Sequence, residues 1–235
     1  MKRVPIKRTP LINRILPDYT RGEEIFNMVS HIVGGVFALV ALVLTVVMAA
    51  HKGDVWGVVA ASIYGASMLL LYTMSSIYHG LKAPIAKRVF QIIDHCAIFI
   101  LIAGSYTPLT LCALRPQYPV LAWWLFGVVW GVAILGITLN AIDIKKYAAF
   151  SMICYLAMGW CVVLMIKPLL TAVEIQGFWL LLAGGLAYTI GAVLYNAGKK
   201  RLRYMHSVFH LFVVAGSVFH FFCILFYVIP VNQYA

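Results

Sequence analysis

Long, uninterrupted apolar runs decide which fold this chain can adopt. Each run is about twenty residues or longer, which is the length that an α-helix needs to cross the hydrocarbon core of a bilayer. Apolar residues are continuous within the runs and do not alternate, unlike the strands of an outer-membrane barrel. The sequence therefore predicts an all-α integral membrane protein with a bundle of seven transmembrane helices. The seven segments are about 25–50, 55–79, 90–113, 119–140, 147–170, 176–197 and 205–229.

The first 24 residues differ from the rest of the chain. They are basic and contain three prolines, and a full-length span follows them without a cleavage-site pattern. The remainder is so apolar that a soluble globular protein is excluded, since 63% of the whole chain is hydrophobic and only 11% is charged. No internal repeat or long linker divides it. We therefore expect a basic cytoplasmic arm over 1–24 and a single seven-helix membrane domain over 25–235.

Basic residues fall almost entirely on one side of the predicted bundle. Of the 18 Lys and Arg residues, only Lys52, Arg115 and Lys167 lie in loops on the other side. The positive-inside rule then places the N-terminus in the cytoplasm and the C-terminus outside. The same residues favour contact with anionic lipid headgroups at the cytoplasmic face. They occur in short runs at helix ends, with no soluble domain to carry a binding face, so a nucleic-acid partner is not expected.

Candidate metal ligands occur in the second and seventh segments. His206 and His210 are four residues apart, so both imidazoles project from one face of a helix. That spacing suits a metal such as zinc, and it equally suits two histidines that hydrogen bond to neighbouring helices. In the second segment, Ser75 and His79 also lie four apart on one face. Taken alone, His79 is also compatible with a place among the lipid headgroups.

The carboxylate of Asp94 is predicted to lie at the same depth in the membrane as these histidines. Asp94 falls inside the apolar register of the third segment, where an ionisable group is a functional hypothesis by default. The predicted topology puts His79, Asp94 and the histidine pair within about 6 to 9 Å of one level below the cytoplasmic surface. Three imidazoles in one layer predict a zinc site with ligands His79, His206 and His210 and an open fourth position. Asp94 fits either as a ligand or as the group that holds or deprotonates the bound water, with Ser75 beside it.

Other polar residues of the spans have plainer interpretations. Glu24, Asn27 and His31 form one stripe in the first segment, which we interpret as helix-to-helix hydrogen bonding or as the wall of a site. His220 lies about 15 Å deeper than the histidine pair by helix rise and is interpreted as a packing residue. We expect close packing around the glycines of the sixth segment, and a kink or a freed carbonyl over 104–108.

Several further side chains are predicted to lie at the lipid, in loops or in the core. Trp123, Trp124 and Trp130 are interpreted as lipid-facing and interfacial anchors, and Asp143 as a solvated loop residue. The five cysteines show no Cys-x-x-Cys spacing and are expected to be small buried residues. They are Cys96, Cys112, Cys154, Cys161 and Cys223.

Together the motifs resemble those of a known family. Ser75 and His79 match a Ser-x3-His pattern, Asp94 follows, and His206 and His210 match His-x3-His, as in the hemolysin III branch of the progestin and adipoQ receptor family. The segments 23–31 and 103–108 are also similar to that branch. The resemblance implies seven helices with the N-terminus inside, in a bacterial plasma (inner) membrane. It also implies zinc on the three histidines, with Asp94 contacting the metal through water and Ser75 nearby.

Three functions are compatible with these features. The eukaryotic receptors of that family are associated with hydrolysis of ceramide-type lipid amides, so the resemblance implies a zinc-dependent hydrolase of a membrane-lipid amide or ester. Such an enzyme would use Asp94 to move the proton. The alternative is a non-catalytic membrane sensor or regulator, in which a structural zinc ties the second segment to the seventh. The branch name also implies a pore-forming hemolysin, although no long amphipathic segment supports that function.

Overall fold

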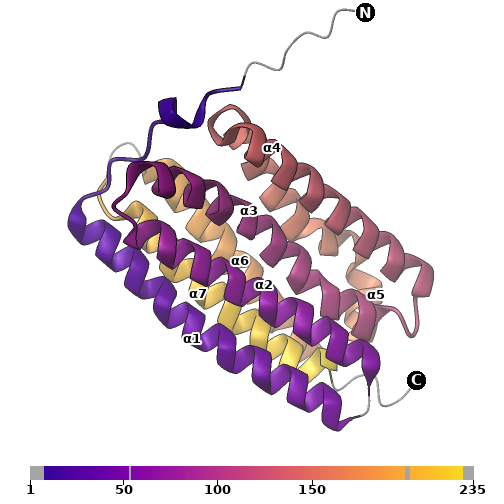
Figure 1. Ribbon diagram of the computed structural model, residues 1–235. Coiled ribbons are helices and arrows are strands. Elements are labelled where there is room, and N and C mark those ends of the chain that lie inside the picture. Colours follow the sequence, from indigo (N-terminus) through magenta and orange to yellow (C-terminus); the bar gives the residue numbers. More distant parts are fainter. Residues whose placement is uncertain (1–7, 53, 199–201, 230–235) are drawn as a thin grey trace, which may run out of the picture.

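Helices account for nearly all of the chain in the computed structural model, which describes residues 8–52, 54–198 and 202–229. No strand occurs within those ranges. Neighbouring helices pack side by side, and α7 packs against both α6 and α1, so the last helix lies beside the first (Figure 1). The long helices are α1 (Arg21–His51), α2 (Val55–Gly80), α3 (Pro84–Pro108), α4 (Pro119–Trp160), α6 (Ile175–Gly198) and α7 (Met205–Cys223). Shorter elements are η1 (Leu11–Asn13), η2 (Leu109–Leu114), η3 (Cys161–Met165), α5 (Ile166–Ala172) and η4 (Ile224–Val228).

Six helical segments of the described chain are long and apolar enough to cross a membrane, which confirms an all-α membrane protein. The fourth of these, Pro119–Ala172, contains both the fourth and the fifth predicted segments. It is not one straight rod, because the extended backbone of Asp143 (φ −162°, ψ 102°) joins two helices across a kink inside α4. The count of seven spans and the orientation stay predictions.

The described part of the N-terminal arm, which begins at residue 8, lies at the same end of the bundle as this kink (Figure 1). Within the described part, Arg14 donates to the carbonyl of Ile142 (2.7 Å), and Arg88 donates to the carbonyl of Arg14 (2.8 Å). Helix α1 already begins at Arg21, with Thr20 as its cap. The division of the chain at residue 24 stays a prediction. Residues 1–7, 199–201 and 230–235 lie outside the described ranges, and so do the Lys and Arg residues that they contain.

Helix α1 buries one narrow stripe whose chemistry changes along its length. The first third of the stripe is polar and the rest is made of small residues, which let α2 approach closely. A Cβ added to Gly34 would lie 2.7 Å from the Tyr72 ring, and one added to Gly65 would lie 2.7 Å from the Cα of Leu42. The stripe consists of Glu23, Asn27, His31, Gly34, Ala38, Ala41, Thr45 and Ala49.

The contact between α6 and α7 confirms the close packing expected at Gly184 and Gly191, whereas the prediction was wrong for Gly185, which has open space beside it. Glycines recur every seven residues along α6, and each faces a large side chain of α7 or η4. At Gly184 an added Cβ would lie 2.2 Å from the His220 ring, so only glycine fits there without a shift. The four pairs are Gly177 with Tyr227, Gly184 with His220, Gly191 with Phe212, and Gly198 with Met205.

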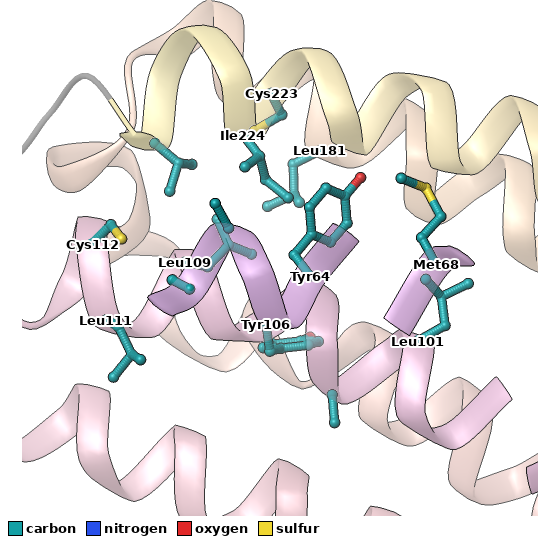
Figure 2. Packing of buried hydrophobic residues seen from close by; sticks show 14 of the residues in the cluster. Tyr64, Met68, Leu101, Tyr106, Leu109, Leu111, Cys112, Leu181, Cys223 and Ile224 are labelled. Atoms are coloured by element: carbon teal, nitrogen blue, oxygen red, sulfur yellow. The ribbon is translucent and has the colours of Figure 1, made fainter. Parts of the chain in front are cut away.

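The apolar core draws buried residues from all the long helices, and part of it lies where α2 and α3 meet α7 and η4. Figure 2 shows Met68 of α2 above Leu101 of α3, and Tyr64 of α2 beside Ile224, the first residue of η4. Four of the five cysteines are buried and Cys161 is partly buried, and no disulfide joins them, as predicted. After Pro108, α3 passes directly into the π-helical turns of η2. The expected irregularity therefore takes the form of a wider helical path, because proline cannot supply the amide hydrogen that an α-helix needs.

Two predictions about individual side chains were wrong. Asp143 is not solvated but only 3% exposed, because its carboxylate accepts hydrogen bonds from the backbone of Thr9, Lys145 and Lys146. Hydrogen bonding, chiefly with Thr9, lowers the pKa of Asp143 to about 2. Trp130 is partly buried and donates to Thr107, whereas Trp123 and Trp124 are exposed as expected.

Candidate metal centre

Three imidazoles meet at the end of the bundle that carries the N-terminal arm. His79 lies at the end of α2, and His206 and His210 occupy the first two turns of α7. The Nε2 atom of His206 is 3.3 Å from that of His79 and 3.1 Å from that of His210. All three ligand atoms lie within 4.8 Å of one another. A tetrahedral zinc ion holds its nitrogen ligands about 3.3 Å apart, so these residues could hold a metal ion.

Hydrogen bonds on the far side of two rings fix which nitrogen carries the proton. His79 Nδ1 lies 2.6 Å from Glu24 Oε2, and His210 Nδ1 lies 3.2 Å from the carbonyl of Asn27. Both oxygens accept, so we assign the hydrogen to Nδ1 in each ring and a lone pair to each Nε2. His206 Nε2 can donate to at most one of these lone pairs, and its buried Nδ1 has no partner within the described residues. Nitrogen lone pairs that converge in this way fit a cation.

Glu24 is held in place by a buried lysine. Lys87 Nζ lies 2.8 Å from Glu24 Oε1 and also donates to the carbonyls of Tyr78 (3.1 Å) and Leu81 (3.2 Å) at the end of α2. One ammonium group therefore caps α2 and positions the carboxylate that orients His79. The sequence interpretation counted Lys87 only among the loop charges. A usable signal was Pro84, which starts α3 and puts Lys87 in its first turn.

The start of α7 is fixed by the neighbouring glutamate of α1. Glu23 forms a capping box with Thr20 and also accepts a hydrogen bond from the backbone N–H of Tyr204 (2.8 Å). Tyr204 has a φ of 61°, a left-handed conformation that is uncommon outside glycine. Glu23 thus joins the first turns of α1 and α7, and this places His206 next to His79.

The polar stripe of α1 lies directly against the metal centre. Glu24 bonds to His79, and Asn27 accepts a hydrogen bond from Ser207 (2.6 Å), so helix-to-helix hydrogen bonding is confirmed for these two residues. His31 makes no hydrogen bond with the described residues. Its ring stacks on the ring of His210 with centroids 3.6 Å apart. The stripe therefore both bridges helices and lines the site.

Asp94 and Ser75 lie beside the three histidines but not among them. Asp94 is 9% exposed and interacts electrostatically with His79, yet its carboxylate does not belong to the group of converging ligand atoms. The Ser75 hydroxyl faces this carboxyl but makes no hydrogen bond of ordinary geometry with the described residues. Their chemical roles therefore remain proposals. His220 lies apart from the site, where its ring bonds to the carbonyl of Leu181 (3.3 Å).

Tyr19 of the N-terminal arm covers the centre, which sequence reasoning missed. Its ring stacks on His206 (centroids 5.1 Å apart, 15° between planes) and lies 5.7 Å from the ring of His79. Burial raises the pKa of the Tyr19 hydroxyl, so it stays protonated at neutral pH. No sequence signal pointed to this residue, because nothing in a basic arm indicates where it folds back.

Comparison with known proteins agrees with these motifs. The family model described as "Haemolysin-III related" matches residues 19–221. The chain is 41% identical to Hemolysin-3 of Bacillus cereus over 208 residues, covering 88% of this chain and 93% of the relative. It is 38% identical to the Hemolysin-3 homolog of Bacillus subtilis (strain 168) over 213 residues, covering 91% and 98%.

More distant similarity extends to animals. The monocyte to macrophage differentiation factor of Homo sapiens is 26% identical over 224 residues, covering 92% of this chain and 88% of the relative. No solved structure matches significantly. The spanning helices and the bacterial relatives identify a multi-pass protein of the plasma membrane. The match over most of its length shows that the chain belongs to the haemolysin-III-related family, in agreement with the branch that its motifs resemble.

Proposed function

We propose that this protein is a zinc-dependent hydrolase that cleaves an amide or ester of a membrane lipid. The observation that carries the proposal is the convergence of three Nε2 atoms beside a buried carboxylate. Three imidazole ligands and a free fourth position are the arrangement of catalytic zinc sites. Zinc also suits imidazole ligands at this spacing better than magnesium or calcium, which prefer oxygen.

Each side chain has a distinct task in such a reaction. A zinc ion bound here would polarise the scissile carbonyl and lower the pKa of a bound water. Asp94 accepts the proton from the attacking water and passes it to the leaving group, and the Ser75 hydroxyl orients the Asp94 carboxylate. Glu24 keeps the Nδ1 proton on His79, so that Nε2 stays free as a ligand.

The lipid and the membrane surface are the partners that this function requires. The acyl chain of the substrate lies among the apolar side chains of the bundle, and its polar end reaches the three histidines. Exposed basic residues at the same end, including Arg21, Lys82 and Arg203, attract anionic headgroups. No nucleic acid takes part.

Metal and product analysis on matched variants tests the proposal. The wild type should contain one zinc per chain and release fatty acid from a lipid amide or ester. His206→Ala should lose both zinc and activity. Asp94→Asn should keep zinc but lose activity, because only the proton acceptor is removed. A wild type that contains zinc and hydrolyses no lipid amide or ester would refute the enzymatic function.

A second candidate is a sensor or regulator in which zinc is structural. Helix α2 packs mainly against α1 and α3, and α7 packs mainly against α6. Between α2 and α7, Tyr72 donates to Ser217 (2.7 Å), and a metal on the three histidines would tie the two helices together at the other end of their contact. This function predicts that zinc removal lowers thermal stability and that Asp94→Asn leaves the cellular phenotype unchanged. Loss of the phenotype in Asp94→Asn would favour the hydrolase.

A further inference from the structure

Two side chains next to the metal centre are buried with polar atoms that have no partner. Asn27 is 0% exposed and His31 is 3% exposed. Within the described part of the chain, Asn27 Nδ2 and both ring nitrogens of His31 make no hydrogen bond. A buried polar group without a partner destabilises a protein, so native structures contain few of them and each calls for an explanation.

These atoms lie together on the inner side of the metal centre. Asn27 and His31 are one helical turn apart on the buried face of α1. The His31 ring is stacked on His210 (3.6 Å, 12°) and meets the edge of the Tyr72 ring at 5.0 Å. The carbonyl groups of Asn27 are already used by His210 and Ser207, which leaves only its amide hydrogens free.

His220, a partly buried histidine between α6 and α7, offers a comparison with His31. His220 is also packed between helices, and its Nε2 lies 3.3 Å from the carbonyl of Leu181. An imidazole between helices of this fold can therefore be paired with a helix carbonyl. His31 is more deeply buried than His220, yet its ring nitrogens have no such partner among the described residues.

We propose that Asn27 and His31 form a recognition subsite for a hydroxyl group of the lipid substrate. A free amide N–H donates, and a neutral imidazole offers one donor and one acceptor. A hydroxyl satisfies both, because it donates and accepts at once, whereas an apolar chain would leave these atoms unpaired. Neither side chain supplies a counter-charge, which favours an uncharged ligand. The inference rests on the proposed function, since it places the hydroxyl of an N-acyl amino alcohol beside the histidines.

Equilibrium binding tests the subsite without relying on turnover. The probe is a fluorescent ceramide isostere in which a CH2 group replaces the amide nitrogen, so that it cannot be cleaved. Its partner probe has the hydroxyls methylated. Binding is measured on the full-length, zinc-loaded protein in lipid nanodiscs. The wild type should prefer the hydroxyl probe about tenfold, the usual effect of one or two lost hydrogen bonds in a buried site.

Substitutions at His31 should remove and restore this preference. His31→Phe keeps an aromatic ring against His210 but carries no polar atom, so the preference should disappear while zinc content stays at the wild-type level. Its melting temperature without probe should be equal or higher, because an unpaired polar group is gone. His31→Gln keeps a donor and an acceptor and should retain most of the preference. His220→Phe is the matched control and should bind like the wild type but melt at a lower temperature.

The outcomes separate the subsite from the reaction. If His31→Phe keeps the wild-type preference, or if it loses zinc and stability together, the subsite is refuted and His31 is structural. If the preference depends on His31 but no lipid amide or ester is hydrolysed, the subsite stands and the reaction fails. If hydrolysis occurs and both probes bind the wild type equally, the reaction stands and the subsite fails.

Discussion

Two buried polar clusters of this bundle differ in whether their polar side chains have hydrogen-bond partners. In the first, which we call the α4 network, Ser151 donates to Asn140 (2.7 Å), Asn140 donates to Tyr155 (3.3 Å), and Tyr155 donates to the carbonyl of His95 (2.8 Å). Each side chain has its partner. The second cluster is the metal centre. There Asn27 Nδ2, His31 Nδ1 and Nε2, and His206 Nδ1 have no partner among the described residues.

We infer from this difference in pairing that the α4 network stabilises the fold and that the metal centre binds a ligand. A complete network can stabilise a helix contact, since every buried group is paired. An incomplete one costs stability, and a protein keeps such a cluster where a ligand supplies the missing partners. We therefore expect substitutions in the α4 network to change stability alone, and substitutions at the metal centre to change what the protein binds.

The largest effect is expected at the metal ligands. His79→Ala and His210→Ala should reduce bound zinc from one per chain to near zero, because two imidazoles cannot complete the site. Mass spectrometry of the purified metal content checks this. His220→Ala serves as the control, since His220 lies outside the group of converging ligand atoms and its loss should leave zinc bound. If the His79→Ala protein keeps the zinc content of the wild type, the proposed zinc site is refuted.

A smaller effect is expected from the carboxylate behind His79. Glu24→Gln should weaken zinc binding about 10- to 100-fold, because the amide orients the His79 ring less strongly than a carboxylate does. Competition with a chelator of known affinity measures it. The matched control is Glu174→Gln, since Glu174 is exposed and does not belong to the group of converging ligand atoms. Equal zinc affinity in the two variants would show that Glu24 has no orienting role.

The α4 network should respond in stability and not in metal binding. Asn140→Leu leaves the Ser151 hydroxyl without its acceptor and removes the bond that Tyr155 accepts, while Tyr155 keeps its bond to the carbonyl of His95. The substitution should cost about 1–3 kcal/mol in the free energy of unfolding. Denaturant titration in detergent measures the loss, with zinc content measured in parallel. A variant that loses zinc with unchanged stability would contradict the distinction between the two clusters.

The smallest effect concerns Asp143 at the kink of α4. Its pKa is lowered to about 2 from 3.8, so the charged carboxylate contributes stability at neutral pH. This contribution should fade as the pH falls from about 4 towards 2, where the carboxyl becomes protonated in the folded state too. Melting temperatures of the wild type and Asp143→Asn should therefore differ at pH 7 and converge near pH 2. A constant difference across this range would rule out the charge as the cause.

The local sequence pattern predicted the membrane helices and the histidine pair. The features that it did not predict depend on contacts between residues far apart in the sequence. Apolar length alone locates the membrane helices, and a spacing of four places His206 and His210 on one face of α7. The partnership of Glu24 with His79 joins residues 55 positions apart, and the bond from Thr9 to Asp143 spans 134. No periodicity encodes such pairs, so the orienting carboxylate and the buried kink could not be predicted. The contact of Tyr19 with His79 and His206 could not be predicted for the same reason.

The order of the metal centre along the chain has a consequence for biosynthesis. The carboxylate comes from α1, the first imidazole from α2, the supporting lysine from α3, and the remaining two imidazoles from α7. A ribosome delivers α7 last, so Glu24, His79 and Lys87 enter the membrane before the helix that completes the site exists. If the three histidines bind zinc as proposed, only a chain that includes α7 can hold the ion with all three ligands. Metal loading would then report that insertion is complete, since a chain that ends before α7 lacks two of the three imidazoles.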